Sequence, residues 1–249
     1  MTYVISDIHG NSRRFNSVME QIALQPDDTL YVLGDVIDRY PDGIRLLRQL
    51  MRMPNVKMIL GNHEYMMLNV LDRQEDTADS YSHAIRLWYH NGGEVTHQYL
   101  KHIRKSARKE IFEFLRSLPL NRFVEVNGRS FTLVHGGATE FYTDYEYRYG
   151  TMEEYAVWHR VYYRENELEG STMIFGHTPT MEYQHNNPLE IWTSETGGKI
   201  GIDCGCGFPP SLSQGRHPAY GRLACLRLDD MKVFYSEEEI PGEVEEIVW

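Results

Sequence analysis

Five short clusters of Asp, His and Asn residues stand out in this sequence, because each follows a run of apolar residues and is flanked by glycine. The candidate ligands in these clusters are Asp7, His9, Asp35, Asn62, His135 and His177. Carboxylates, imidazoles and amide oxygens suit Mn²⁺, Fe or Zn²⁺ as ligands. The clusters therefore predict a metal site, provided that the fold brings them together.

The same residues can be divided between two ions. Asp7 and His9 are separated by one residue, so on an extended stretch both side chains would point to the same side and bind one ion. If six ligands serve two ions, one carboxylate must be shared, and Asp35 is the candidate. Each cluster alone is more often a structural feature, but five clusters in equivalent positions favour metal binding.

Runs rich in β-branched and aromatic residues precede the clusters and predict buried strands. These runs span residues 3–6, 29–33, 56–60, 131–134 and 173–175. Apolar residues at helical spacing predict helices over 12–24 and 43–51, so the first 65 residues alternate between strand and helix. That alternation requires parallel strands with right-handed crossovers. Polar sites collect at the carboxyl ends of such strands, where all five clusters fall.

The rest of the chain contains further predicted elements. Residues 65–118 have helical periodicity, with a break near residues 91–93. Three alternating runs predict antiparallel strands at residues 199–203, 223–228 and 232–235. Asp229–Asp230 predicts a hairpin turn between the last two of these strands.

Composition excludes several classes of protein. The formal net charge of −11 argues against a non-specific nucleic-acid binder, but bound metal ions would still allow a phosphate-handling enzyme. No apolar run approaches the ~18 residues of a membrane helix, and residues 1–7 do not resemble a signal peptide. We therefore expect a cytoplasmic protein that binds neither nucleic acid nor membrane. Cys204, Cys206 and Cys225 predict buried strand thiols rather than a disulfide framework or a zinc site.

A family resemblance rests on five motifs taken together. They are Asp7-Ile8-His9-Gly10, Gly34-Asp35-Val36-Ile37-Asp38-Arg39, Gly61-Asn62-His63-Glu64, His135-Gly136-Gly137 and Gly176-His177-Thr178-Pro179. The set resembles the calcineurin-like metallophosphoesterase superfamily and, within it, the phosphoprotein phosphatases, especially small bacterial and bacteriophage serine/threonine phosphatases. The resemblance implies an α/β fold, a four-layer α/β/β/α sandwich with two mixed β-sheets. It also implies a single domain over residues 1–249, with a helical insertion at about 65–118.

The resemblance implies a role for each candidate residue. Asp7 and His9 would hold the first metal ion, Asp35 would bridge the two ions, and Asn62, His135 and His177 would hold the second. His63 would be the general acid and Asp38 its orienting partner. Arg39 matches a phosphate-binding arginine, and Arg160 is the candidate for a second, with Arg148 and Arg164 as rivals.

The reaction implied by the resemblance is hydrolysis of phosphate monoesters by in-line attack of a metal-bridging hydroxide. Two divalent ions would be the cofactors, with Mn²⁺ favoured and Fe or Zn²⁺ as alternatives. The substrate would be a phosphorylated protein or a small phosphate ester, as in serine/threonine protein phosphatases.

Three other functions stay open at this point. A symmetrical dinucleoside-tetraphosphate hydrolase shares the scaffold, although its third motif more often ends in Asp than in the Glu64 found here. Phosphodiesterases and nucleases often have a further metal-binding His where this chain has Pro179. A catalytically silent phosphate-binding scaffold is disfavoured by the complete ligand set together with His63 and Arg39.

One position departs from the family pattern. The motif arginine is usually followed by glycine, whereas Arg39 is followed by Tyr40. A tyrosine would be strained if this position required a positive φ. We therefore expect the loop that carries Arg39 to differ from the family pattern.

Overall fold

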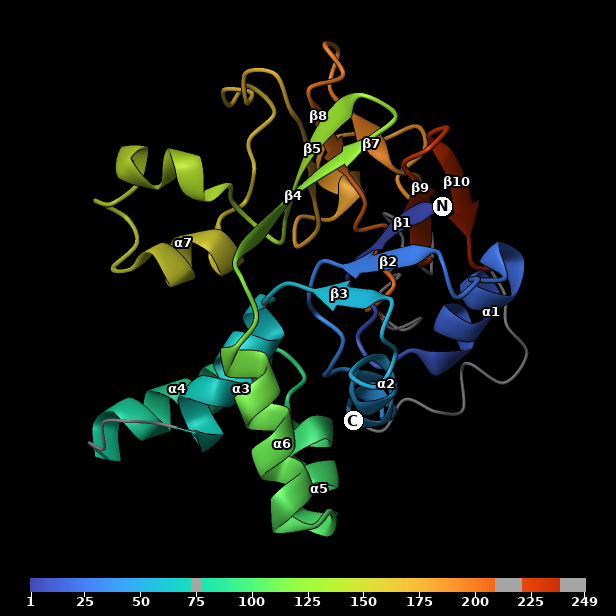
Figure 1. Ribbon diagram of the computed structural model, residues 1–249. Coiled ribbons are helices and arrows are strands. Elements are labelled where there is room, and N and C mark those ends of the chain that lie inside the picture. The colour runs from blue at the N-terminus through green and yellow to red at the C-terminus, as the bar shows by residue number, and fades with distance from the viewer. Residues whose placement is uncertain (73–77, 209–220, 238–249) are drawn as a thin grey trace.

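Two five-stranded sheets form the centre of the protein, as seen in a computed structural model that describes residues 1–72, 78–208 and 221–237 (Figure 1). The first sheet has the order β10 (Lys232–Tyr235), β9 (Ala224–Arg227), β1 (Thr2–Ile5), β2 (Thr29–Val32) and β3 (Val56–Met58). The second has the order β4 (Asn121–Val126), β5 (Arg129–Val134), β6 (Thr172–Phe175), β8 (Lys199–Gly201) and β7 (Trp192–Thr193).

Both sheets are mixed, and each has three parallel strands at its centre or edge. In the first sheet β1, β2 and β3 are parallel, whereas β9 and β10 are antiparallel. In the second sheet β5, β6 and β8 are parallel, whereas β4 and β7 are antiparallel to their neighbours. The prediction of an α/β fold with two mixed sheets is confirmed. The parallel strands are the ones whose carboxyl ends can present a site.

An apolar layer joins the two sheets face to face. Val4 and Leu33 from the first sheet and its strand ends pack with Leu133 and Ile174 from the second, and all four are fully buried. Because both sheets contribute to this one core, their strand ends are held in a fixed relation to each other.

Helices cover the outer face of the first sheet. They are α1 (Ser12–Ile22) and α2 (Gly43–Leu50), whose apolar residues include Phe15 and Leu47 and pack in one cluster with Ile5 and Val32. On the second sheet, Phe175 packs with Ala138, Val161 and the partly buried Phe141 of the 3₁₀ helix η1 (Thr139–Asp144). Helix α7 (Met152–Trp158) and a short 3₁₀ helix, η2 (Thr180–Glu182), lie in the connections on this side.

In the described residues between β3 and β4, four helices form a group to one side of the sheets (Figure 1). They are α3 (Asn62–Leu71), α4 (Ala78–His90), α5 (Glu94–His102) and α6 (Lys105–Arg116). The break expected near residues 91–93 is the turn between α4 and α5. Trp88, Leu100 and Leu115 belong to the same apolar cluster as the first sheet, so this group is packed onto the body of the protein.

Several elements differ from the sequence-based expectations. Cys204, Cys206 and Cys225 are all buried and none of them forms a disulfide, but only Cys225 lies in a strand, because β8 ends at Gly201. Strand β4 and helix α7 were not expected, since neither segment has a continuous apolar pattern. In the described part of the chain, the longest apolar helices fall short of what is needed to cross a lipid bilayer.

Candidate metal centre and active site

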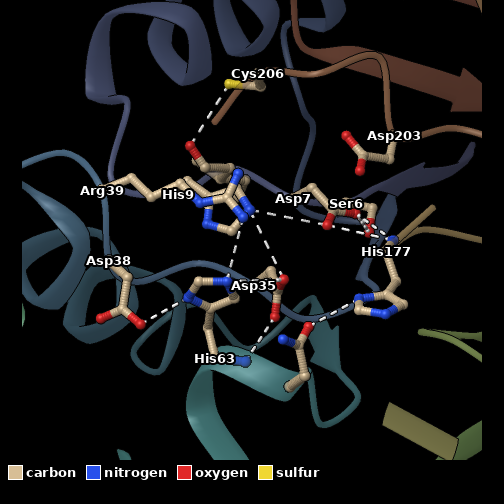
Figure 2. A network of polar contacts seen from close by, with 12 residues as sticks. Ser6, Asp7, His9, Asp35, Asp38, Arg39, His63, His177, Asp203 and Cys206 are labelled. Atoms are coloured by element: carbon tan, nitrogen blue, oxygen red, sulfur yellow. Dashed lines mark hydrogen bonds and ion pairs between the residues drawn. The ribbon is translucent and has the colours of Figure 1, made fainter. Parts of the chain in front are cut away.

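The six candidate ligands meet at the edge of the two sheets where the parallel strands have their carboxyl ends. Asp7 and His9 follow β1, and Asp35 follows β2. Asn62 is the first residue of α3, and His135 and His177 follow β5 and β6. All six side chains belong to buried residues. Figure 2 shows Asp35 between His9, His63 and His177.

One group of ligands forms around the amide of Asn62. Asn62 Oδ1 lies 2.9 Å from His135 Nε2 and 3.0 Å from His177 Nδ1. Asp35 Oδ1 lies 3.4 Å from His135 Nε2. Ligand atoms bound to one ion at ~2.1 Å are separated by about 3.0–3.4 Å in octahedral or tetrahedral geometry. These four side chains therefore have the mutual spacing of a single coordination sphere.

A second group forms on the other side of Asp35. His9 Nε2 lies 3.7 Å from Asp35 Oδ2 and 3.9 Å from Asp7 Oδ1. His63 Nε2 lies 3.8 Å from the same Asp35 oxygen. The spacing is slightly wider than in the first group, but carboxylate and imidazole atoms again converge. Donor atoms of His9, Asp35 and His63, and of Asp35, His135 and His177, make up the two triplets that could each hold an ion among the described residues.

Asp35 belongs to both groups and divides its oxygens between them. Oδ1 faces His135 and accepts a hydrogen bond from the backbone N–H of His63 at 3.0 Å. Oδ2 faces His9 and His63. A carboxylate in this position can bind one ion through each oxygen. This is how a ligand shared by two ions would act, as expected if six ligands serve two ions.

The imidazoles are oriented for metal binding by the protein backbone. His135 Nδ1 donates to the carbonyl oxygen of Leu33 at 2.6 Å, and His9 Nδ1 donates to that of Ile37 at 3.2 Å. Each bond places the proton on Nδ1 and leaves the lone pair of Nε2 directed at the ligand groups. His177 differs from these two, because the nitrogen that faces the ligand group is its Nδ1, 3.0 Å from Asn62 Oδ1. This donor set fits divalent cations.

Burial shifts the pKa values of the candidate ligand side chains. It raises the pKa of Asp35 to about 7 and also raises the pKa of Asp7, to which the nearby Asp203 carboxylate contributes as well. It lowers the pKa of His9, and the charge of Arg39 lowers it further. Neutral imidazoles are the form that binds metals. Buried carboxylates at this density need compensating positive charge, which two divalent cations would provide.

Backbone strain is concentrated at the site. Six of the nine non-glycine residues with positive φ among the described residues are candidate site residues, namely Asp7, His9, Asp35, Asp38, Arg39 and His177. A left-handed conformation in a non-glycine residue costs on the order of 1–3 kcal/mol, and such residues persist only where the surrounding structure enforces them. The expectation of an extended stretch at Asp7 and His9 is wrong: their φ angles are 55° and 50°. The two side chains meet because the chain turns back at each residue.

Glu64 holds the strained loop after β2. Its Oε2 accepts a hydrogen bond from the N–H of Asp35 at 2.9 Å. Its Oε1 accepts from Val36 at 2.9 Å and from Ile37 at 3.3 Å. Glu64 is fully buried, and these three amides satisfy its two carboxylate oxygens. The residue that closes the third motif thus fixes the backbone of the bridging carboxylate.

His63 and Asp38 form a pair beside the ligand groups. His63 Nδ1 donates to Asp38 Oδ2 at 2.7 Å, and both residues are buried. Burial raises the pKa of Asp38 to about 7, opposed by the Thr96 hydroxyl and the Trp88 indole, and it lowers the pKa of His63 to about 3. The bond orients the imidazole so that Nε2 faces Asp35. Arg39 Nη2 lies 3.4 Å from the same Nε2.

Tyr40, which stands where the family usually has glycine, does not cause the expected strain. Tyr40 has no positive φ, because the left-handed conformations fall on Asp38 (φ 72°) and Arg39 (φ 67°). Tyr40 itself is buried, and its N–H donates to the carbonyl oxygen of His9 at 3.1 Å. A tyrosine is therefore tolerated without strain at its own position, and Arg39 still points at His63.

Two of the three candidate arginines of the later loops, Arg160 and Arg148, differ in their surroundings. Arg160 is exposed on the loop after α7; burial lowers the pKa of both His135 and His177, and the positive charge of Arg160 contributes to both shifts. Arg148 donates to the Tyr162 hydroxyl at 2.7 Å instead. Proximity to the ligands therefore favours Arg160 over Arg148 as the second phosphate-binding residue.

Asp203 is a site residue that sequence reasoning missed. It is buried, lies in the loop after β8, and accepts a hydrogen bond from Gly205 N at 2.9 Å. Its carboxylate raises the pKa of Asp7, and Figure 2 shows it on the side of Asp7 and His177. The signal was present, because Asp203 follows a strand and lies two residues from glycines on both sides, and the five clusters also follow apolar runs and are flanked by glycine.

Replacing Asp35 tests the shared carboxylate. In Asp35→Asn the side chain keeps its size and tolerates the left-handed backbone, but the negative charge is lost. We expect the affinity for both ions to fall by about 100-fold or more, since indirect changes around metal ligands already cost ~10–100-fold. Metal content after dialysis is the measurement, with the exposed Asp230→Asn as control. Two ions retained at full occupancy would show that Asp35 is no bridge.

Replacing Glu64 tests the three-amide contact. Glu64→Gln places an N–H₂ group against backbone N–H donors, so we expect the free energy of unfolding to fall by ~3 kcal/mol. Urea unfolding measures the change, and Glu113→Gln on the exposed face of α6 is the matched control. A variant as stable as the control would contradict the assignment.

Comparison with known proteins agrees with this geometry. A serine/threonine-protein phosphatase 2 of Salmonella typhimurium is 28% identical over 190 residues, which cover 70% of this chain and 78% of that protein. A symmetrical bis(5'-nucleosyl)-tetraphosphatase of Baumannia cicadellinicola subsp. Homalodisca coagulata is 39% identical over 71 residues, or 28% of this chain. The aligned part spans only 25% of the length of that tetraphosphatase.

Solved structures and family profiles extend the comparison to most of the chain. The crystal structure of a putative diadenosine tetraphosphatase aligns with a TM-score of 0.58 and 16% identity, covering 97% of this chain and 94% of that one, which shows a common fold. The family profile described as calcineurin-like phosphoesterase matches residues 2–199. The family expected from the five motifs is confirmed: the chain belongs to the calcineurin-like phosphoesterases.

Proposed function

We propose that this protein is a metal-dependent phosphoric monoester hydrolase that acts on phosphorylated proteins as a serine/threonine phosphatase. The observation that carries the proposal is the position of His63 Nε2, which lies 3.8 Å from Asp35 and 3.4 Å from Arg39. A proton donor, a phosphate-binding cation and the shared metal ligand thus face one point.

The cofactors in this proposal are two divalent cations, Mn²⁺ or alternatively Fe or Zn²⁺. Asp7, His9 and Asp35 would hold one, and Asp35, Asn62, His135 and His177 would hold the other. When bound, such ions supply Lewis acidity and a hydroxide nucleophile at neutral pH. The protein's part is to keep these ligands buried and oriented, which the backbone contacts of His9 and His135 do.

Two arginines would bind the phosphate. The guanidinium of Arg39 can make two parallel hydrogen bonds to phosphate oxygens, where charge spreads in the transition state. Arg160 would approach from the loop after α7. Their charges attract a dianionic ester locally, even though the formal net charge of the chain is −11.

His63 would protonate the leaving oxygen. An alkoxide is a poor leaving group, and a proton from Nε2 removes this difficulty. A phosphate dianion next to Nε2 would raise the pKa of His63, because an opposite charge favours the protonated imidazole. Asp38 would stabilise the same form through its bond to Nδ1.

A second candidate is the symmetrical hydrolysis of dinucleoside tetraphosphates. The local identity of 39% to a protein with that name supports it. The longer match to the Salmonella phosphatase, over 70% of this chain, supports the protein phosphatase. The two substrates differ in groups that the proposed phosphate-binding residues would not contact.

A substrate panel tests the proposed function. Purified protein with Mn²⁺ is assayed on an aryl phosphate, a phosphoserine peptide, a phosphotyrosine peptide and a dinucleoside tetraphosphate. We expect kcat/KM for the phosphoserine peptide to exceed that for the tetraphosphate, and Asp35→Asn to abolish both. A preference for the tetraphosphate would favour the second candidate, and no hydrolysis with any added cation would identify a silent scaffold.

Replacing His63 tests its role as proton donor. In His63→Ala we expect kcat for the phosphoserine peptide to fall by ~10²–10⁴-fold, the range of general acid catalysis. An aryl phosphate should lose far less, because its leaving group is stable as an anion. Metal content should be retained, because Asp7, His9 and Asp35 are the proposed ligands of the ion beside His63. His102→Ala on the exposed side of α5 should behave like the wild type. Equal losses on both esters would remove His63 from this role.

A further inference from the structure

The helices α4 and α5 supply contacts to the Asp38–Arg39 loop that the family motifs do not account for. Trp88 Nε1 donates to Asp38 Oδ2 at 2.9 Å. This is the same oxygen that accepts from His63 Nδ1 at 2.7 Å. Trp88 is fully buried, so its indole N–H has a fixed direction. The Asp38 carboxylate is therefore held between an indole on α4 and the imidazole on α3.

The backbone of the same loop is bonded to the turn and helix that follow Trp88. Asp38 N donates to Thr96 Oγ1 at 3.0 Å, and Arg39 N donates to the carbonyl oxygen of Gly92 at 3.1 Å. Asp38 and Arg39 are consecutive non-glycine residues with positive φ. Hydrogen bonds from outside the loop are what such a conformation needs in order to persist.

Two glycines make these contacts possible. Gly92 has φ +90°, and a Cβ on it would lie 2.9 Å from Cγ of Arg39. A Cβ on Gly93 would overlap the indole ring of Trp88. The break at residues 91–93 is thus the place where the helical group approaches the phosphate-binding arginine and leaves room for the tryptophan.

We propose that Trp88 and Thr96 are positioning residues for His63, acting through Asp38 from the helices α4 and α5. Trp88 fixes the carboxylate that orients the imidazole, and Thr96 fixes the backbone of that carboxylate's residue. This inference rests on the proposed function, because the step that it serves is proton donation by His63.

The experiment compares variants that remove one hydrogen bond and keep the packing. Trp88→Phe removes the indole N–H. Thr96→Val removes the hydroxyl, and Thr96→Ser restores it. Trp192→Phe changes an indole that is also buried but packs on Tyr183 and Phe175, away from the Asp38 loop, and serves as the control.

The kinetic measurement separates positioning from general stability. In Trp88→Phe we expect kcat for a phosphoserine peptide to fall about tenfold, as for the loss of one hydrogen bond to a carboxylate. kcat for an aryl phosphate and both KM values should change by less than about threefold, because that ester does not require a proton donor. Thr96→Val should show the same split, and Thr96→Ser and Trp192→Phe should behave like the wild type.

A spectroscopic measurement does not depend on turnover. The Nδ1–H proton of His63 is followed by NMR in Zn²⁺-loaded protein labelled with ¹⁵N-histidine, and His63→Ala identifies its signal. We expect this signal to shift in Trp88→Phe and to stay in place in Trp192→Phe. An unchanged signal, or equal losses of kcat on both esters, would overturn the inference.

The design separates the two proposals. If the wild type hydrolyses neither ester with Mn²⁺, the proposed function is wrong, and the position of the His63 signal alone decides whether Trp88 orients it. If Trp88→Phe does not fold, Thr96→Val and Thr96→Ser decide through the same two measurements.

Discussion

The site depends on one carboxylate whose oxygens face two ways. Asp35 directs Oδ1 at His135 and Oδ2 at His9, so the ligands that follow the strands of both sheets share a single side chain. A carboxylate placed this deep, with Asp7 and Asp203 nearby, is costly without cations. The buried position of Asp35 therefore explains both the geometry of the ligand groups and their need for positive charge.

The fold stores strain in order to keep that carboxylate in place. Asp7, Asp35 and His177, three of the six candidate ligands, have left-handed backbone conformations. Two features oppose the strain: the hydrogen bonds that three backbone amides donate to Glu64, and the apolar layer between the sheets. Because Glu64 is one residue after His63 on α3, the same helix turn holds the backbone of the proposed bridging ligand and presents the proposed proton donor.

The residues proposed to orient His63 and to bind phosphate are supported from outside the sheets. Asp38 and Arg39 sit on a loop whose backbone and carboxylate are bonded to α4, α5 and the turn between them. The helical group is thus part of the site rather than an appendage to it. A serine/threonine phosphatase and a tetraphosphate hydrolase can share everything described up to this point, since both reactions break a phosphorus–oxygen bond. Their difference must come from residues that contact the rest of the substrate.

The sequence by itself determined the family, the alternation of strands and helices, and the residue types of the ligand groups. It could do so because the carboxyl ends of parallel strands are the natural place for polar residues, and all five clusters follow apolar runs. Asp203 follows the same rule and was overlooked because its segment read only as a strand. Three features depend on the tertiary structure. They are the hydrogen bond from Trp88 to Asp38, the hydrogen bonds from three backbone amides to Glu64, and the left-handed conformations of Asp7 and His9. Each depends on contacts between segments distant in the chain, or on a backbone angle that local residue preference disfavours, and neither leaves a periodic pattern in the sequence.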